Sequence, residues 1–200
     1  MVDLRSLSSE RIRQCLRRQS GVTYDIPVHW GSQESLPAAV LIPFFHYQDE
    51  WRLIYIRRAP HEQDQHGGQV AFAGGKYEPG DRDLQATALR EAQEEIGLHP
   101  QDVKILGRLN HHHSISHFKI TPVVGQIPWP YALNPDKNEV ARVFTIPLEW
   151  LADARNHRIK YHVMKQRPAI PVVYFNEFEG EILWGATARM TLSLISVLSR

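Results

Sequence analysis

Three glutamates that lie close together are the residues in this sequence best suited to chemistry. Glu91, Glu94 and Glu95 occupy positions i, i+3 and i+4, which are neighbouring positions on a helix surface. The apolar residues around them also have helical spacing, so the three carboxylates line one edge of the face that a helix would bury. Like charges in this arrangement repel one another, and partial burial raises the cost of each charge. Arg90 can compensate Glu94 at i+4, whereas Glu91 and Glu95 need another cation.

A divalent metal ion is the cation that such a carboxylate group favours. Mg²⁺ and Mn²⁺ prefer carboxylate oxygens, together with backbone carbonyls, water and substrate phosphates. The alternative is a solvated acidic helix face, which is common on protein surfaces. The surrounding residues favour the metal site, because a glycine pair, Gly74 and Gly75, precedes the glutamates by one loop and Gly97 follows them directly.

The helix that carries the glutamates has the clearest signals of any expected element. It is predicted over residues 84–96, with Asp83 as the N-cap and Gly97 as the stop. Further helices are predicted over residues 7–18, 147–152 and 186–198, and strands over residues 38–45, 51–58, 69–72, 103–109, 119–127, 140–146, 170–175 and 181–184. Strands interrupted by helices in this way imply an α/β sandwich with a mixed sheet.

Length and composition exclude several classes of protein. The 200 residues are enough for one domain, and 23 Lys plus Arg against 22 Asp plus Glu leave a formal charge of +1. A dedicated nucleic-acid binder or a polybasic membrane protein is therefore not expected. The single cysteine, Cys15, lies on the apolar face of the first predicted helix, where we expect a small buried hydrophobic side chain. Without a signal-peptide pattern or a membrane-spanning stretch, a cytoplasmic protein is expected.

Residues 75–98, GKYEPGDRDLQATALREAQEEIGL, resemble the Nudix box. That motif has a glycine, five residues, an acid, seven residues and then REUXEEXGU, in which U is aliphatic. The second half matches in register; Asp81 holds the acid position, and eight residues instead of seven separate it from Arg90. The resemblance implies a Nudix-type α/β/α sandwich with a mixed β-sheet, formed by one domain of residues 1–200 that includes an N-terminal helical extension over residues 1–20.

The resemblance also implies a reaction and the residues that perform it. Nudix enzymes hydrolyse a diphosphate joined to another moiety by attack of water on phosphorus, with Mg²⁺ or Mn²⁺ as cofactor. By resemblance, the metal ligands are Glu91, Glu94, Glu95 and the carbonyl of Gly74, Arg90 orients the glutamates, and the general base is Glu94 or Glu139. For Glu139, an ion pair with a neighbour such as Arg142 is an equal alternative.

Residues 53–75 resemble the extra motif of the coenzyme A pyrophosphatase branch of this family. The residues that fit it, and that are expected to bind substrate, are Arg58, Gly68, Phe72 and Gly75. The chain departs from the motif in three ways: Ala73 replaces a proline, the loop is one residue longer, and Gln63 or Asp64 replaces a second arginine. His61 or His66 are weaker phosphate partners in the same loop. Arg57 and Arg58 are adjacent on a predicted strand, so at most one of them faces a phosphate site.

The first functional hypothesis is a metal-dependent hydrolase that splits coenzyme A or acyl-CoA into adenosine 3′,5′-bisphosphate and 4′-phosphopantetheine. Losing a guanidinium removes a bidentate phosphate contact, which keeps a pyrophosphatase for ADP-ribose or a dinucleotide open. A third hypothesis is a non-catalytic sensor that binds a nucleotide. The expected partner is a small nucleoside diphosphate rather than nucleic acid or a membrane, and a homodimer is left open.

Two other groups of conspicuous residues receive structural interpretations. His111, His112, His113 and His117 lack an accompanying cysteine, so a polar loop is favoured over a zinc site. The aromatic group of Trp129, Pro130 and Tyr131 could stack on an adenine, but packing is the favoured role.

Overall fold

The computed structural model describes residues 4–20, 22–25, 35–60, 67–164 and 167–200. Its helices are α1 Ser9–Arg18, α2 Leu84–Ile96, α3 Leu148–Ala152 and α4 Gly185–Leu198, with 3-10 turns at Pro100–Asp102 and Ala154–Asn156. Its strands are β1 Leu36–Tyr47, β2 Glu50–Arg58, β3 Val70–Ala71, β4 Gly74–Lys76, β5 Lys104–Arg108, β6 His112–His113, β7 Phe118–Gln126, β8 Val140–Pro147, β9 His157–Met164 and β10 Arg167–Phe175.

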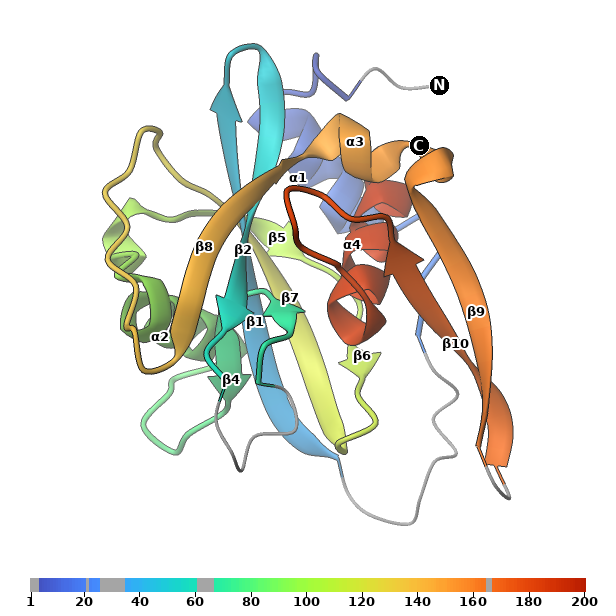
Figure 1. Ribbon diagram of the computed structural model, residues 1–200. Helices are drawn as coiled ribbons and strands as arrows, with labels where there is room; N and C mark the ends of the chain where they lie inside the picture. The colour runs from blue at the N-terminus through green and yellow to red at the C-terminus, as the bar shows by residue number, and fades with distance from the viewer. Residues whose placement is uncertain (1–3, 21, 26–34, 61–66, 165–166) are drawn as a thin grey trace.

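The main sheet has eight strands and is enclosed by helices on both sides (Figure 1). The central order is β3-β2-β1-β7-β5, with β4 beside β1, β6 beside β7 and β8 beside β2. Because β1 and β7 run parallel while the other pairs are antiparallel, the sheet is mixed. α2 covers one face, and α1 and α4 cover the other. The predicted α/β/α sandwich with a mixed sheet is confirmed.

Alternation along β2 assigns its side chains to two separate cores. Leu53 and Tyr55 pack with α1 and α4, whereas Ile54 and Ile56 pack with α2. Successive side chains of a strand point to opposite faces, so the last two residues of β2 point to opposite sides of the sheet. Only one of those two can reach the face that carries α2.

Local capping fixes the ends of α2 as the sequence predicts. The Asp83 side chain accepts a hydrogen bond from the Ala86 N–H at 2.8 Å. Gly97 has a φ of 69°, a left-handed conformation that glycine adopts without steric cost. These two signals set the length of the helix and therefore the direction in which its glutamates point.

The N-terminal helix agrees with its prediction apart from its first residues. α1 starts at Ser9 because the Ser8 hydroxyl accepts a hydrogen bond from the Arg11 N–H at 3.1 Å. Cys15 is 4% exposed and packs in the core beneath the helix, so its predicted structural role is confirmed. In the part of the chain that the structure describes, no helix is both long and apolar enough to cross a membrane.

Four strand assignments differ from the sequence predictions, and one of them is β4, which the sequence does not predict. Residues 181–184 form only isolated bridges, in which Glu181 pairs with Phe178 and Trp184 with Tyr174. The strand β9 was not predicted; it forms a separate two-stranded ribbon with β10 beside α4 (Figure 1). The polar loop predicted around the histidines is wrong at His112 and His113, which form β6 on the edge of β7.

His112 is fully buried, and this predicts an acid-sensitive fold. Burial, assisted by the Arg189 charge, lowers the pKa of His112 to about 4. An unfolded histidine has a pKa near 6.5, so between about pH 4 and 6.5 the unfolded chain binds more protons than the folded chain. Stability is therefore lost as the pH falls through this window.

The acid limb is the fall in the free energy of unfolding as the pH decreases from 7 to 4. We expect His112→Phe to flatten it when that free energy is measured by urea denaturation. The control His99→Phe changes an exposed histidine and should keep the wild-type limb. Equal acid limbs in wild type and His112→Phe would show that other groups set the acid sensitivity.

Candidate active site

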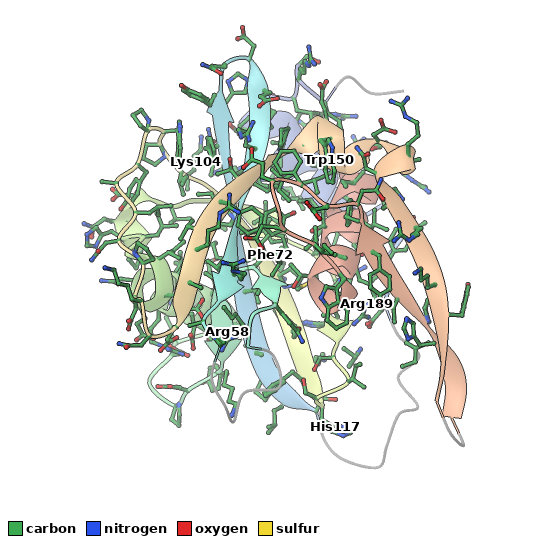
Figure 2. The ribbon with its side chains drawn as sticks, viewed as in Figure 1. Arg58, Phe72, Lys104, His117, Trp150 and Arg189 are labelled. Carbon is green, nitrogen blue, oxygen red and sulfur yellow. The ribbon has the colours of Figure 1, made fainter. Side chains whose placement is uncertain are left out.

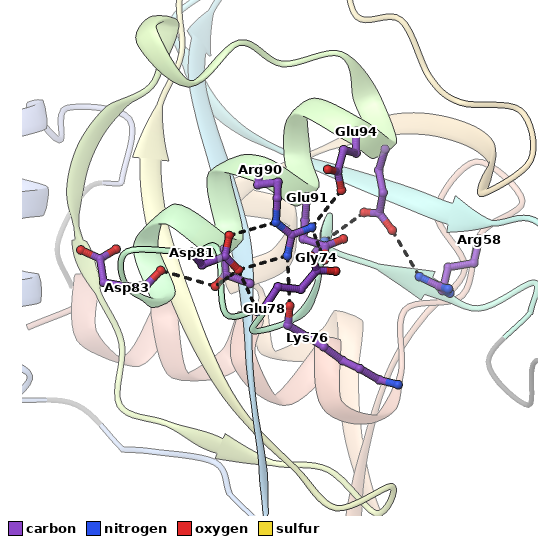
Figure 3. Close-up of polar contacts among 11 residues, drawn as sticks. Arg58, Gly74, Lys76, Glu78, Asp81, Asp83, Arg90, Glu91 and Glu94 are labelled. Carbon is purple, nitrogen blue, oxygen red and sulfur yellow. Dashed lines mark hydrogen bonds and ion pairs between the residues drawn. The ribbon is translucent and has the colours of Figure 1, made fainter.

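The buried carboxylate of Glu95 joins three elements at one place; its partners Arg58 and Gly74 are labelled in Figure 3. The side chain of Glu95 is 2% exposed. One oxygen, Oε2, accepts a hydrogen bond from the Gly74 N–H at 2.9 Å, and the other, Oε1, lies 3.3 Å from Nη1 of Arg58. Glu95 thus ties α2 to the start of β4 and to the end of β2.

The Arg90 guanidinium is the centre of a second polar group on α2. It binds both oxygens of Asp81, from Nε at 3.0 Å and from Nη2 at 3.1 Å. It also contacts Glu91 Oε1 at 3.0 Å, Glu94 Oε2 at 2.9 Å and the carbonyl of Lys76 at 3.1 Å. The predicted i+4 pair with Glu94 is confirmed. The expectation that Glu91 has no partner on the helix is wrong, because the neighbouring Arg90 side chain reaches it.

Asp81 anchors this second group from the loop before the helix. Its carboxylate is 5% exposed and accepts hydrogen bonds from the Thr87 hydroxyl at 2.8 Å and from the Glu78 N–H at 3.0 Å. The Arg90 hydrogen bonds hold the pKa of Asp81 well below its usual range. The sequence predicts Asp81 only as the acid of the Nudix-like motif. That motif position is the one sequence signal for its structural role.

The site carries more negative charge than its cations neutralise. Burial raises the pKa of Glu95 to about 7, against the opposing effects of the Gly74 N–H and Arg58. Burial also raises the pKa of Glu91, and the charge of Glu139 adds to the shift at both glutamates. Partly buried carboxylates of this kind favour a cation. The donor set, made of carboxylate oxygens, fits a hard divalent ion.

The carboxylates do not converge as the side chains stand. Among the described residues, no three Asp, Glu, His or Cys side chains are placed together so that they could hold a metal ion. The Glu94 side chain is 56% exposed and turns to Arg90, while Glu95 turns to Arg58 and Gly74. Each of the three glutamates predicted as ligands is thus held by a group of the chain itself.

Glu139 lies beside the end of β2. The Glu139 carbonyl accepts a hydrogen bond from the Ala59 N–H at 2.8 Å, and the next residue, Val140, pairs with Arg58 across the sheet. The alternative ion pair with Arg142 is not formed; Arg142 pairs instead with Glu181 at 3.0 Å. The structure therefore brings Glu139 toward the carboxylate group and leaves its side chain exposed.

The two adjacent arginines of β2 point to opposite faces, as predicted. Arg58 reaches Glu95 on the α2 side, whereas Arg57 lies 3.4 Å from Glu181 on the other side. Only Arg58 is therefore in a position to meet a phosphate at the carboxylate group. Its side chain is 29% exposed, so Arg58 is partly accessible to solvent.

Of the predicted substrate-binding residues, Phe72 lies away from the carboxylates, and Gly68 contacts the backbone of Arg58. Phe72 is 2% exposed and stacks on Tyr55 with ring centroids 4.7 Å apart, in the core on the face opposite α2 (Figure 2). The structure does not bring the Phe72 side chain to the site, because strand alternation directs it into that core. Gly68 is exposed with a φ of 76°, and its N–H binds the Arg58 carbonyl at 3.0 Å. The predictions for Gln63, Asp64, His61 and His66 lie outside the described residues.

The remaining histidines and aromatic residues have structural partners elsewhere. His111 lies 2.9 Å from the Thr121 hydroxyl, and His113 lies 2.7 Å from Asp25. Trp129 stacks on Phe45 with centroids 3.9 Å apart. Packing is thus the observed role of Trp129.

The glycine pair at the start of β4 leads to a prediction that separates stability from activity. A Cβ at Gly74 would meet backbone atoms of β1, 2.6 Å from the Val40 Cα, whereas the three atoms nearest to a Cβ at Gly75 all belong to the carboxylate of Glu91. Backbone cannot yield, but a side chain can.

We therefore expect Gly74→Ala to destabilise the protein by about 1–3 kcal/mol, as measured by urea denaturation. Gly75→Ala should leave the stability near wild type and lower kcat, because Glu91 must move. Gly80→Ala, where a Cβ meets nothing within 4 Å, is the control. If Gly75→Ala keeps full activity, the position of Glu91 does not matter for turnover.

Comparison with known proteins identifies the family. The family model of the NUDIX domain matches residues 35–167. The chain belongs to the Nudix family. The Nudix hydrolase NudL of Yersinia pestis (strain Pestoides F), described as uncharacterized, is 39% identical over 173 residues, which cover 86% of this chain and 84% of the relative. The NudL of Yersinia pseudotuberculosis serotype O:1b (strain IP 31758) has the same identity and coverage.

Solved structures agree with the Nudix fold. The Nudix hydrolase RenU of M. Smegmatis has a TM-score of 0.50 at 20% identity and covers 60% of this chain and 76% of its own. A MutT/nudix family protein of Enterococcus faecalis has a TM-score of 0.50 at 11% identity, with coverages of 95% and 73%. As a Nudix hydrolase, the chain acts on diphosphate bonds, and the family typically uses a divalent metal.

Proposed function

We propose that the protein hydrolyses the diphosphate of coenzyme A or acyl-CoA and releases adenosine 3′,5′-bisphosphate and 4′-phosphopantetheine. The observation that carries the reaction is the buried Glu95 carboxylate, held between the Gly74 N–H and Arg58 beside the partly buried Glu91. The choice of substrate rests on the resemblance of residues 53–75 to the coenzyme A pyrophosphatase motif.

The cofactor in this proposal is Mg²⁺ or Mn²⁺. The residues that would hold it are Glu91, Glu94, Glu95 and the carbonyl of Gly74. When bound, the ion neutralises diphosphate charge and lowers the pKa of a bound water. The excess of buried carboxylate charge supports this assignment, since an anionic substrate would be repelled from the site without a cation.

Residues of the chain orient the glutamates, bind the phosphate and accept the proton of the attacking water. Arg90, fixed by Asp81, orients Glu91 and Glu94 through the contacts at 3.0 and 2.9 Å. Arg58, which is partly exposed, binds a phosphate oxygen with its guanidinium. Glu94 or Glu139, both exposed, accepts the proton of the attacking water.

Gly75 and Gly68 support the site through the backbone. Gly75 leaves the space that the Glu91 carboxylate occupies. Gly68 allows the turn whose N–H binds the Arg58 carbonyl. In this assignment Phe72 acts indirectly, because its buried ring fixes the chain that leads into Gly74.

A substrate panel tests the proposal. Purified protein with Mg²⁺ or Mn²⁺ is given coenzyme A, acetyl-CoA, ADP-ribose and diadenosine polyphosphates, and the products are identified by mass. We expect the two coenzyme A substrates to be cleaved with the highest kcat/KM and EDTA to abolish cleavage. A preference for ADP-ribose or a dinucleotide would overturn the substrate assignment, and inactivity on every substrate without metal binding would indicate a sensor.

A further inference from the structure

A cavity of about 570 Å³ lies at the opposite end of α2 from the carboxylates. Its walls come from the first turn of α2 and the loop before it, and from β5 and β7. Seven helical positions separate Leu84 at this cavity from Glu91, the nearest of the three glutamates, which is about 10 Å at 1.5 Å per residue. Its volume is within the range of small-molecule sites, so the cavity is large enough for a ligand of its own.

Two arginines from different elements give the cavity a positive rim. Arg82 belongs to the loop before α2, and its side chain is 83% exposed. Arg108 ends β5 and is exposed as well. The acidic neighbour Asp83 lies 3.5 Å from Arg82, but it also accepts the Ala86 N–H as the helix cap. The rim thus carries two guanidinium groups against one carboxylate that is already engaged.

The charges of the adjoining strand add to this positive field. Burial lowers the pKa of His111, and the charges of Lys119 and Arg108 lower it further. His111 binds the hydroxyl of Thr121, which lines the cavity. Arg108 lines the cavity, and Lys119 lies two residues before Thr121 on β7, so both charges favour an anion there.

The floor of the cavity is apolar and suits a ring. Leu84, Ile105 and Val123 line it, and Tyr77 adds an aromatic side chain that is 38% exposed. Aromatic and aliphatic side chains of this kind pack against a planar base. A ligand that carries both a ring and a phosphate matches the floor and the rim together.

We propose that this cavity is a second site, which binds a mononucleotide with its base on the Tyr77 side and its phosphate held by Arg82 and Arg108. The site is independent of the proposed hydrolysis, because its residues are separate from the carboxylates. Hydrolysis of a nucleoside diphosphate derivative releases a mononucleotide, so the ligand is a chemical relative of the product.

The test is calorimetric titration of the full chain with AMP in EDTA, where hydrolysis and metal-dependent binding are absent. The double variant Arg82→Ala, Arg108→Ala should weaken AMP binding by about tenfold or more, since each guanidinium gives charge-assisted hydrogen bonds. Arg17→Ala with Arg18→Ala removes the same charge from exposed positions at the end of α1 and should leave the affinity within about twofold of wild type. Inorganic phosphate should show the same sensitivity as AMP, and adenosine should bind weakly and equally to all three proteins.

Three outcomes would overturn the proposal. They are the absence of AMP binding at millimolar concentration in EDTA, equal AMP affinity in the two double variants, and stronger binding of adenosine than of AMP. Each can occur while coenzyme A hydrolysis is fully active, so failure of this inference is distinguishable from failure of the proposed function. Thermal unfolding of both double variants verifies that they are folded.

Discussion

Glu95→Gln is expected to lower kcat by about 10²- to 10³-fold while the protein stays folded, a loss typical of removing one preorganised electrostatic group. The glutamine keeps the shape of the side chain, and its carbonyl oxygen can still accept the Gly74 N–H. It removes the negative charge that Arg58 faces at 3.3 Å and that the proposed metal site needs. Because burial makes this charge unfavourable, as its pKa of about 7 indicates, removing it should leave stability unchanged or raise it.

The measurement is kcat on coenzyme A with Mn²⁺, together with the thermal midpoint in EDTA. Glu10→Gln makes the same chemical change on α1, where the side chain is 59% exposed, and should keep wild-type kcat. If Glu95→Gln retains full turnover as a folded protein, Glu95 has no part in the reaction. A lower thermal midpoint in EDTA would show instead that the Glu95 charge stabilises the fold.

The helix of the carboxylates was predictable because its signals are local. The N-cap Asp83, the stop at Gly97 and the apolar spacing between them act within a few residues. The same periodicity indicates which side chains of the helix point toward β4. The sequence was therefore sufficient to place Glu91 and Glu95 together on the inner edge of α2.

The partners of the site residues were less predictable because they depend on contacts between distant segments. Arg142 pairs with Glu181, 39 residues away, and not with its close neighbour Glu139. Arg58 meets Glu95 across 37 residues of sequence. Strand alternation indicates which face a side chain occupies, but the element that covers that face is set by the tertiary fold.

The strand predictions failed where pairing with another strand or packing in the core determines the structure. β9 alternates basic and apolar residues, and its pairing with β10 makes it a strand. Residues 181–184 have strand-like composition, yet only Glu181 and Trp184 make single bridges there. Phe72 matched a motif for substrate binding, but its position opposite Tyr55 places the ring in the core. Composition alone does not distinguish these cases.

Arg90→Ala is expected to lower the free energy of unfolding by about 3 kcal/mol, because it leaves the buried Asp81 carboxylate without its cation. It should also lower kcat by about 10²-fold, since Glu91 and Glu94 lose the contact that orients them. Asp81→Asn should destabilise too, but with a smaller effect on kcat, because Arg90 keeps its bonds to the glutamates and to the Lys76 carbonyl.

The double variant Arg90→Ala, Asp81→Asn measures how much the interaction between Arg90 and Asp81 contributes to stability. When both partners are removed, no buried charge is left unpaired, so the double variant should be more stable than the sum of the single losses predicts, by about 1–3 kcal/mol. Urea denaturation at pH 7 measures all four free energies. Arg155→Ala breaks an exposed Arg–Asp pair of similar length, 2.6 Å from Asp153, and should have a far smaller effect. Additive losses, or an Arg90→Ala effect as small as that of Arg155→Ala, would mean that packing of α2 on the sheet positions the glutamates and that Asp81 does not.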